Sequence, residues 1–204
     1  YANLVIAFQI SYAVGMLGAG WVIDKIGTKL GYPLSLTLWS LAAVLHAFAK
    51  TTVGFMAARS FLGVSEAGNF PAAIKTTAEW FPKKERALTT GIFNSGSNIG
   101  AIIAPLTVPL IALTWGWEWA FIITGLIGLI WLLFWFAYYE VPTKHKKLSQ
   151  AELEYIQSDA DEREELKNVD KVSWFKLLTL PQTWTFLLGK FLTDPVWWFY
   201  LFWL

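Results

Sequence analysis

The sequence predicts an all-α protein that crosses a membrane several times, and three observations indicate this fold class. Hydrophobic residues make up 55% of the 204 residues and charged residues only 15%, which is unusual for a soluble domain. The mean hydropathy is +0.45. Apolar runs long enough to cross a hydrocarbon core recur along the chain. There is no cysteine, which excludes disulfide and thiol chemistry.

Five full membrane helices and the start of a sixth are expected from these runs. The predicted spans cover residues 1–23, 32–49, 55–80, 88–113 and 120–139, and the last begins near residue 183. Pro105 and Pro109 are expected to bend the fourth span, because each removes a backbone hydrogen bond. Both ends of the sequence lie in apolar helices, so we expect an internal fragment of a longer protein.

Residues 141–172 differ from the rest because they are rich in charge. Ser149 and Glu152 form a capping-box pattern that predicts a soluble helix to about Lys167. In the last span Lys190 and Asp194 are four residues apart and can pair. Pro195 is expected to break that helix, which makes the pair a candidate gate or binding site.

Basic residues predict the orientation. The loops at 24–31, 82–87 and 143–172 lie on one side and hold most of the loop lysines and arginines. The positive-inside rule places these loops in the cytoplasm. The net charge of +1 gives no indication of a nucleic-acid partner.

The most informative charges are Arg59 and Glu66, inside the third span. They are seven residues apart, nearly two helical turns, and share a face with Gly63 between them. Each charge near a bilayer centre costs roughly 2.5–3.5 kcal/mol on insertion scales. One interpretation is a polar cavity that binds an anion at Arg59 and a proton at Glu66. The other is a structural ion pair.

Polar residues on two other spans add candidates for the same cavity. Asn94, Ser97 and Asn98 share a helix face, and their amide and hydroxyl groups suit sugar hydroxyls or carboxylate oxygens; helix–helix hydrogen bonding is the alternative. Tyr12 is either an interior hydrogen-bond donor or a packed aromatic residue. His46, near a helix end, is expected to be structural.

Three other functional classes are less favoured. The segment Gly63-Val64-Ser65-Glu66 is only a weak match to a serine-hydrolase turn, and an acyl-transfer site also needs oxyanion donors; we therefore expect no enzyme. Two histidines and no cysteine make a metal site implausible. A channel fits less well than a carrier, because paired charges at a single site suit binding. A structural or receptor bundle remains an alternative.

Several motifs resemble those of a known family. Gly20 to Lys29 reads G-x-x-x-D-K-x-G-x-K, which resembles the signature loop of the major facilitator superfamily. The segments around Arg59–Ala67, Glu79–Pro82, Glu85–Arg86 and Gly116–Phe121 resemble its anion:cation symporter branch. Gly68–Lys75 and Asn94–Asn98 resemble bacterial hexuronate transporters in particular.

The resemblance implies twelve helices in two halves that alternate access to a midplane cavity. Residues 1–140 would then be part of the N-terminal half, corresponding to family helices two to six. Residues 141–182 would be a cytoplasmic linker with a short soluble helix and an interfacial segment. Residues 183–204 would begin the C-terminal half with family helix seven.

The resemblance also implies roles. Arg59, Tyr12, Asn94, Ser97 and Asn98 would bind a small sugar acid, and Glu66 would be the proton-coupling carboxylate. Asp24, Lys25, Lys29 and Arg86 would form a cytoplasmic gate. No cofactor other than protons is implied, and the protein would work as a monomer in the bacterial inner membrane. An aldonate, an aldarate, an aromatic acid or phosphate is the alternative substrate.

Overall fold

The computed structural model describes residues 2–159 and 174–203, and every described element is helical. The chain forms two compact units, Tyr1–Asp159 and Ala160–Leu204, and each is considered by itself. The absence of strands from the described residues confirms the all-α fold class.

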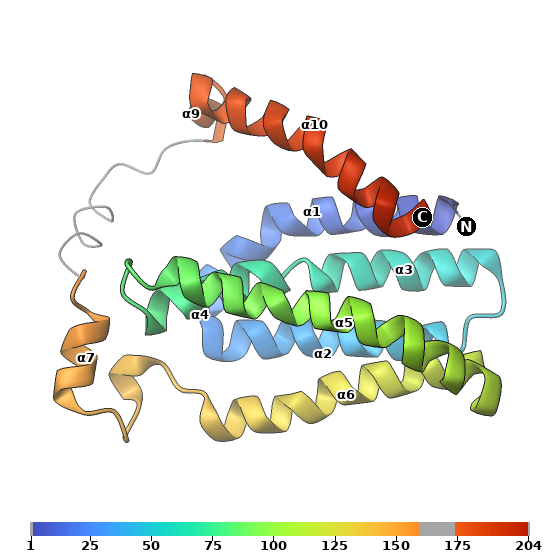
Figure 1. The fold of residues 1–204 in the computed structure, drawn as a ribbon, viewed down its shortest axis with the longest axis horizontal. Helices are drawn as coiled ribbons and strands as arrows, with labels where there is room; N and C mark the ends of the chain where they lie inside the picture. The colour runs from blue at the N-terminus through green and yellow to red at the C-terminus, as the bar shows by residue number, and fades with distance from the viewer. Residues whose placement is uncertain (1, 160–173, 204) are drawn as a thin grey trace. The chain divides into compact units, whose positions relative to one another are not determined.

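The first unit is a bundle of helices that run lengthwise beside one another (Figure 1). α1 packs along α3, α2 packs between α3 and α6, and α5 contacts α6 and α4. Sharp turns at Gly27 (φ 81°) and Gly116 (φ 101°) join neighbouring helices in a backbone region that favours glycine. The helices are α1 (Ala2–Ile26), α2 (Thr28–His46), α3 (Thr52–Glu66), α4 (Asn69–Trp80), α5 (Arg86–Trp115) and α6 (Trp117–Tyr138).

The predicted third span, 55–80, is two helices and not one. α3 ends at Glu66, and α4 begins at Asn69. Pro71 has no N–H to donate to the carbonyl of Ala67, so the hydrogen-bond ladder is interrupted at this point. Proline is tolerated in the first turn of α4, where its missing N–H has no helical partner to lose. The break therefore follows directly after the charged Glu66.

α1 and α3 approach so closely that a side chain would not fit between them at Gly63. A Cβ atom added there would lie 2.6 Å from the Phe8 carbonyl oxygen and 2.9 Å from the Tyr12 nitrogen. The same crossing continues at Gly15, where a Cβ atom would lie 2.8 Å from the Ala67 Cβ atom. Small residues permit such contacts in membrane bundles.

His46 is packed in the bundle, as expected. It is 1% exposed, its ring stacks on Phe121 at 5.0 Å between centroids, and its Nδ1 atom lies 2.7 Å from the Ala42 carbonyl oxygen. These contacts hold α2 against α6 near the ends of both helices.

The charged segment after α6 contains η1 (Pro142–Lys144) and α7 (Gln150–Ile156). The capping box of Ser149 and Glu152 is confirmed. The predicted extension to Lys167 is wrong, because α7 ends at Ile156 and a turn follows; residues 160–167 lie outside the described part. The turn after α7 is joined to the start of α5, since Arg86 pairs with Asp159 at 2.6 Å.

The second unit contains α9 (Trp174–Leu177) and α10 (Pro181–Trp203). Lys190 and Asp194 pair at 2.8 Å, as their spacing predicted. The predicted break at Pro195 is wrong, because α10 continues through it. A proline removes one backbone bond from a helix, and neighbouring turns of a long membrane helix can absorb that loss.

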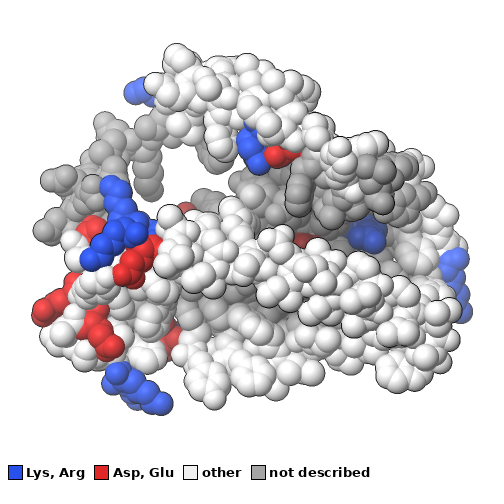
Figure 2. Space-filling model, in the orientation of Figure 1, with Lys and Arg blue, Asp and Glu red and all other residues white. Residues whose placement is uncertain are grey.

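By length and composition, α1, α5 and α6 are the described helices that could cross a membrane. Figure 2 shows that charged side chains on the visible face gather largely at the end that carries α7, while the middle of the bundle is almost uncharged. α5 has no buried residue in this chain. The surface is therefore that of a membrane protein.

Replacing Gly63 with alanine is expected to destabilise the bundle, by roughly 1–3 kcal/mol, because the new methyl group would overlap the α1 backbone. The measurement is the thermal unfolding of the full-length protein in detergent. Gly18→Ala is the matched control, since nothing lies within 4 Å of a Cβ atom at Gly18 and alanine favours helix. Equal melting temperatures for the two variants would contradict the close approach at Gly63.

Candidate functional site

The two charged residues of α3 lie on one helix and are electrostatically coupled. Arg59 and Glu66 are both partly buried, and the charge of Arg59 acts on Glu66. Among the described residues, however, neither takes part in a direct ion pair. Both interpretations of these two charges, a binding cavity and a structural role, stay predictions.

Tyr12 faces the same region from α1. Gly63, which stands between Arg59 and Glu66 in the sequence, packs against the backbone of Tyr12. Tyr12 and Glu66 interact electrostatically, and the Tyr12 ring stacks on Phe8 at 5.8 Å between centroids. The close contact of α1 and α3 thus brings Tyr12, Arg59 and Glu66 into one region.

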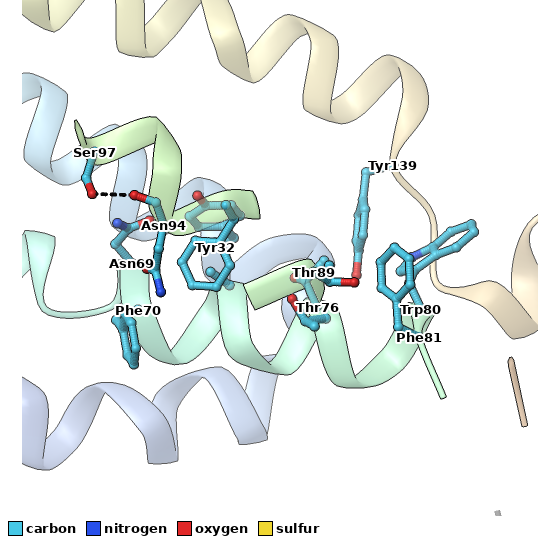
Figure 3. Close-up of a pocket in the computed structure, with 13 residues that line it drawn as sticks. Tyr32, Asn69, Phe70, Thr76, Trp80, Phe81, Thr89, Asn94, Ser97 and Tyr139 are labelled. Atoms are coloured by element: carbon cyan, nitrogen blue, oxygen red, sulfur yellow. Dashed lines mark hydrogen bonds between the residues drawn. The ribbon is translucent and has the colours of Figure 1, made fainter. Parts of the chain in front are cut away.

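A cavity of about 720 Å³ lies between α2, α4, α5 and the end of α6. This volume is within the range of small-molecule sites. Figure 3 shows Asn69 and Asn94 close to each other, with Ser97 donating a hydrogen bond of 2.6 Å to the Asn94 carbonyl oxygen. Aromatic and hydroxyl side chains make up most of the remaining wall, among them Tyr32, Phe70, Thr76, Thr77, Trp80, Phe81, Thr89, Phe93 and Tyr139.

The structure divides the predicted substrate-binding residues into two groups. Asn94 and Ser97 line this cavity, whereas Asn98 does not. Arg59, Glu66 and Tyr12 belong to the α1–α3 crossing and are also absent from the cavity lining. The cavity lining carries no Lys, Arg, Asp or Glu, so it suits the uncharged part of a ligand.

The residues predicted to form a gate are paired with several different elements. Asp24 accepts a hydrogen bond of 2.8 Å from Lys75 of α4, and Lys75 also donates to the Ile23 carbonyl oxygen at 3.2 Å. Lys29 pairs with Glu140. The Lys25 ammonium group lies 5.0 Å from the centre of the Trp21 ring. The Asp24, Lys29 and Arg86 pairs join α1 to α4, α2 to the segment after α6, and α5 to the turn after α7. A gating role for these residues stays a prediction.

A second polar cluster lies at what we call the linker end of the bundle, the end that holds Gly27, Trp80 and Tyr139. The hydroxyl oxygens of Thr28 and Tyr139 lie at hydrogen-bonding distances of 2.6 and 2.9 Å from the Glu79 Oε2 atom. Burial, with a smaller contribution from the hydrogen bond to Glu79, raises the pKa of Tyr139 to about 12. The Tyr139 hydroxyl therefore keeps its proton at ordinary pH.

Sequence reasoning assigned no role to Thr28, Lys75, Glu79, Tyr139 or Glu140. Their partners are far away in the chain: Thr28 is 51 residues from Glu79 and 111 residues from Tyr139. The available signal was the acidic residue in the segment Glu79–Pro82, which stands at the end of the predicted third span. Among the described residues, no group of three or more His, Asp or Glu side chains could hold a metal ion.

Comparison with known proteins identifies the family. The model of the Major Facilitator Superfamily matches residues 1–204. The chain belongs to this superfamily. The signature loop at Gly20–Lys29 is therefore the turn between α1 and α2, and the helical bundle is part of a major facilitator fold in an integral membrane protein.

Several curated relatives are similar over nearly the whole chain. A galacturonate transporter of Dickeya chrysanthemi is 38% identical over 197 residues, which is 97% of this chain and 57% of the relative. A hexuronate transporter of Escherichia coli K12 is 36% identical over 97% of this chain and 46% of the relative. A D-galactonate transporter of Escherichia coli O6:H1 is 32% identical, with 97% and 47% covered. The chain thus spans about half the length of these relatives.

The Lys29–Glu140 pair is expected to make stability depend on pH. The hydrogen bond from Lys29 lowers the pKa of Glu140 below its ordinary value of 4.5. A carboxyl group with a lowered folded-state pKa contributes stability above its unfolded pKa, and this contribution is lost as pH falls through the folded pKa. Lys29→Met should therefore melt below the unmodified protein at pH 7, and the difference should shrink at pH 4 and below.

The matched control for this measurement is Lys25→Met. Lys25 lies over the Trp21 ring and pairs with no acidic residue in the described part of the chain, so its effect on the melting temperature should not vary between pH 7 and 4. If the Lys29→Met difference were equally constant with pH, the pair would not contribute to stability.

Proposed function

We propose that the full-length protein is a secondary active transporter that carries a hexuronate-type organic anion together with a proton, by alternating access. The observation that carries this proposal is the pair Arg59 and Glu66 on a broken membrane helix. Charges in such a position are costly and usually functional. The names of the galacturonate and hexuronate transporters among the relatives support a sugar acid as the substrate.

Arg59 is the proposed anion-binding residue. No ion pair joins its guanidinium group to another described residue, so its donors remain available for a ligand. A guanidinium group can hold a carboxylate through two parallel hydrogen bonds. A uronate bound in this way would bring its negative charge close to Glu66.

Glu66 is the proposed proton-coupling residue. The charge of Arg59 acts on Glu66, and a bound substrate carboxylate would compete with Glu66 for that positive charge. Protonation of Glu66 removes the competition, because two negative groups then no longer share one cation. Proton binding thereby favours anion binding, and release of the proton on the other side of the membrane favours release of the anion.

The sugar part of the substrate needs hydroxyl and amide partners. Asn94 and Ser97 on α5, with Asn69 on α4, supply such groups in the uncharged cavity (Figure 3). Aromatic side chains such as Tyr32 and Phe93 offer flat surfaces for the apolar face of a sugar ring. We assign this cavity to the uncharged end of the substrate and the α1–α3 crossing to its carboxylate.

The remaining expectations belong to the same proposal. The protein works as a monomer in the bacterial inner membrane, uses no cofactor other than protons, and has residues 141–182 in the cytoplasm. The basic residues of the linker end are consistent with this orientation. Another sugar acid is the second candidate substrate, because relatives named for D-galactonate and for galactarate/D-glucarate are each 32% identical.

Uptake by the full-length protein in proteoliposomes tests the proposed function. We expect an inward proton gradient to stimulate the uptake of labelled galacturonate or glucuronate, since protonated Glu66 leaves Arg59 free for the anion. Collapse of the gradient with a proton carrier should abolish the stimulation. Uptake of galactonate or glucarate alone would move the substrate to the second candidate, and uptake of no sugar acid by folded protein would refute the proposal.

Glu66→Gln separates coupling from binding. The amide imitates a protonated carboxyl group, so this variant should lose stimulation by the proton gradient but retain exchange of labelled for unlabelled substrate. Both rates are measured in the same proteoliposomes. Glu118→Gln, at the start of α6, is the matched control and should retain both activities. Loss of exchange as well as stimulation in Glu66→Gln would show that Glu66 is needed for binding.

A further inference from the structure

The polar cluster at the linker end consists of three oxygen atoms that contact each other. The Thr28 hydroxyl lies 2.6 Å from Glu79 Oε2, the Tyr139 hydroxyl lies 2.9 Å from the same atom, and the two hydroxyl oxygens are 2.8 Å apart. All three distances are those of hydrogen bonds. Thr28 is 1% exposed, so water has little access to its side of the cluster.

Three such contacts need three protons, and an ionised Glu79 leaves only two. The hydroxyl groups of Thr28 and Tyr139 each hold one proton, and a carboxylate is an acceptor only. If both hydroxyl groups donate to Glu79, no proton remains between Thr28 and Tyr139. Two oxygen atoms would then face each other at 2.8 Å in a part-buried place without a hydrogen atom between them, which is unfavourable.

We infer that Glu79 binds a proton at this site and thereby closes a ring of three hydrogen bonds with Thr28 and Tyr139. The Glu79 hydroxyl donates to Thr28, Thr28 donates to Tyr139, and Tyr139 donates back to Glu79. One proton, taken from water, completes the ring, and its release leaves two hydrogen bonds. This proton site is distinct from Glu66, which ends the preceding helix.

The cations near Glu79 do not compete for it, because each is occupied elsewhere. Lys29, next to Thr28, pairs with Glu140. Lys75, one turn before Glu79, pairs with Asp24 at 2.8 Å. No ion pair in the described part of the chain includes Glu79. The titratable or charged groups on the surrounding elements are Asp24 and Lys25 of α1, Lys29 and Tyr32 of α2, Lys75 of α4, Lys83, Lys84, Glu85 and Arg86 between α4 and the first residue of α5, and Tyr139, Glu140, Lys144 and His145 after α6.

The ring joins three elements that are separate in the sequence. Thr28 is the first residue of α2, Glu79 lies in the last turn of α4, and Tyr139 follows α6. The Tyr139 ring also stacks on Trp135 at 3.8 Å between centroids, which fixes the position of its hydroxyl group. Protonation of Glu79 would therefore hold the linker ends of these helices together, whether or not the proposed transport function is correct.

Infrared difference spectroscopy of the full-length protein in nanodiscs, between acidic and alkaline buffer and without substrate, tests the proton site. A protonated carboxyl group has a carbonyl band that a carboxylate lacks. We expect such a band in the unmodified protein, and we expect Glu79→Gln to remove it. Glu66→Gln is the matched control, which should leave the Glu79 band in place. If Glu79→Gln removes no band, the inference is wrong.

Tyr139→Phe gives a second test. A ring closed by a protonated Glu79 and an ionised Glu79 that accepts two hydrogen bonds predict opposite shifts in the pH at which the Glu79 band disappears. Loss of this hydroxyl group removes two hydrogen bonds from the protonated ring but only one from the carboxylate, so the Glu79 band should disappear at a lower pH than in the unmodified protein. A carboxylate that merely accepts two hydrogen bonds would lose a stabilising donor, and its band would persist to higher pH. A shift to higher pH, or no shift, would overturn the proposal.

Tyr32→Phe is the matched control for Tyr139→Phe. Tyr32 lies on the same cavity wall and makes an edge-on ring contact with Trp135 at 5.0 Å, but it takes no part in the ring of hydrogen bonds. Removing its hydroxyl group should leave the titration of the Glu79 band unchanged. A shift equal to that of Tyr139→Phe would mean that the cavity in general, and not the ring, controls Glu79, and would also overturn the proposal.

Discussion

The close contact between α1 and α3 at Gly63 is the constraint on which the charged site depends. Because a Cβ atom at Gly63 would meet the α1 backbone at 2.6 Å, the two helices can approach to this distance only with glycine there. Arg59 and Glu66 lie on either side of this contact along α3, and Tyr12 lies opposite. Because glycine has no side chain at this contact, α1 and α3 pack closely enough to bring Tyr12, Arg59 and Glu66 together. The middle of the bundle has few other charged residues.

Charged residues of the bundle fall into two groups, those with an ion-pair partner and those without one among the described residues. At the linker end, Asp24, Lys29 and Arg86 all have partners of opposite charge on other elements, so their charges are balanced within the described chain. Inside α3, Arg59 and Glu66 influence each other without a direct pair. A low-dielectric environment makes an unpaired charge costly. The paired charges at the linker end therefore hold helices together, whereas Arg59 and Glu66 have no ion-pair partner among the described residues and are available for ligands.

Hydropathy and charge spacing predicted the helices well, because membrane spans obey a simple rule of length and polarity. Local backbone effects were harder to predict. Pro71 and Pro195 are the same residue type, yet the chain breaks before the first and continues through the second. Pro71 lies in the first turn of α4, three residues after Gly68 and shortly after α3 has ended at Glu66. Pro195 lies well inside a long helix, where the turns on both sides are intact.

The candidate site was predictable only where its residues share a helix. Arg59 and Glu66, or Asn94 and Ser97, fall on one face by their spacing, so the sequence alone relates them. Thr28, Glu79 and Tyr139 come from three different elements, and only the packing of α2, α4 and α6 brings them together. Some of the proposed substrate residues lie at the α1–α3 crossing and others line the cavity. This division also depends on how the helices pack, which cannot be predicted from the spacing of residues along the chain.

Glu66 and Glu79 stand near opposite ends of α4, and this separation bears on whether they act as one site or two. Glu66 ends α3, Glu79 lies in the last turn of α4, and the 12 residues of α4 make that helix about 18 Å long at 1.5 Å per residue. At an effective dielectric constant of about 20, two unit charges at that distance interact by roughly 1 kcal/mol, which is less than one pH unit. A change of charge at one of the two carboxyl groups therefore acts only weakly on the other, and the two are treated as separate sites.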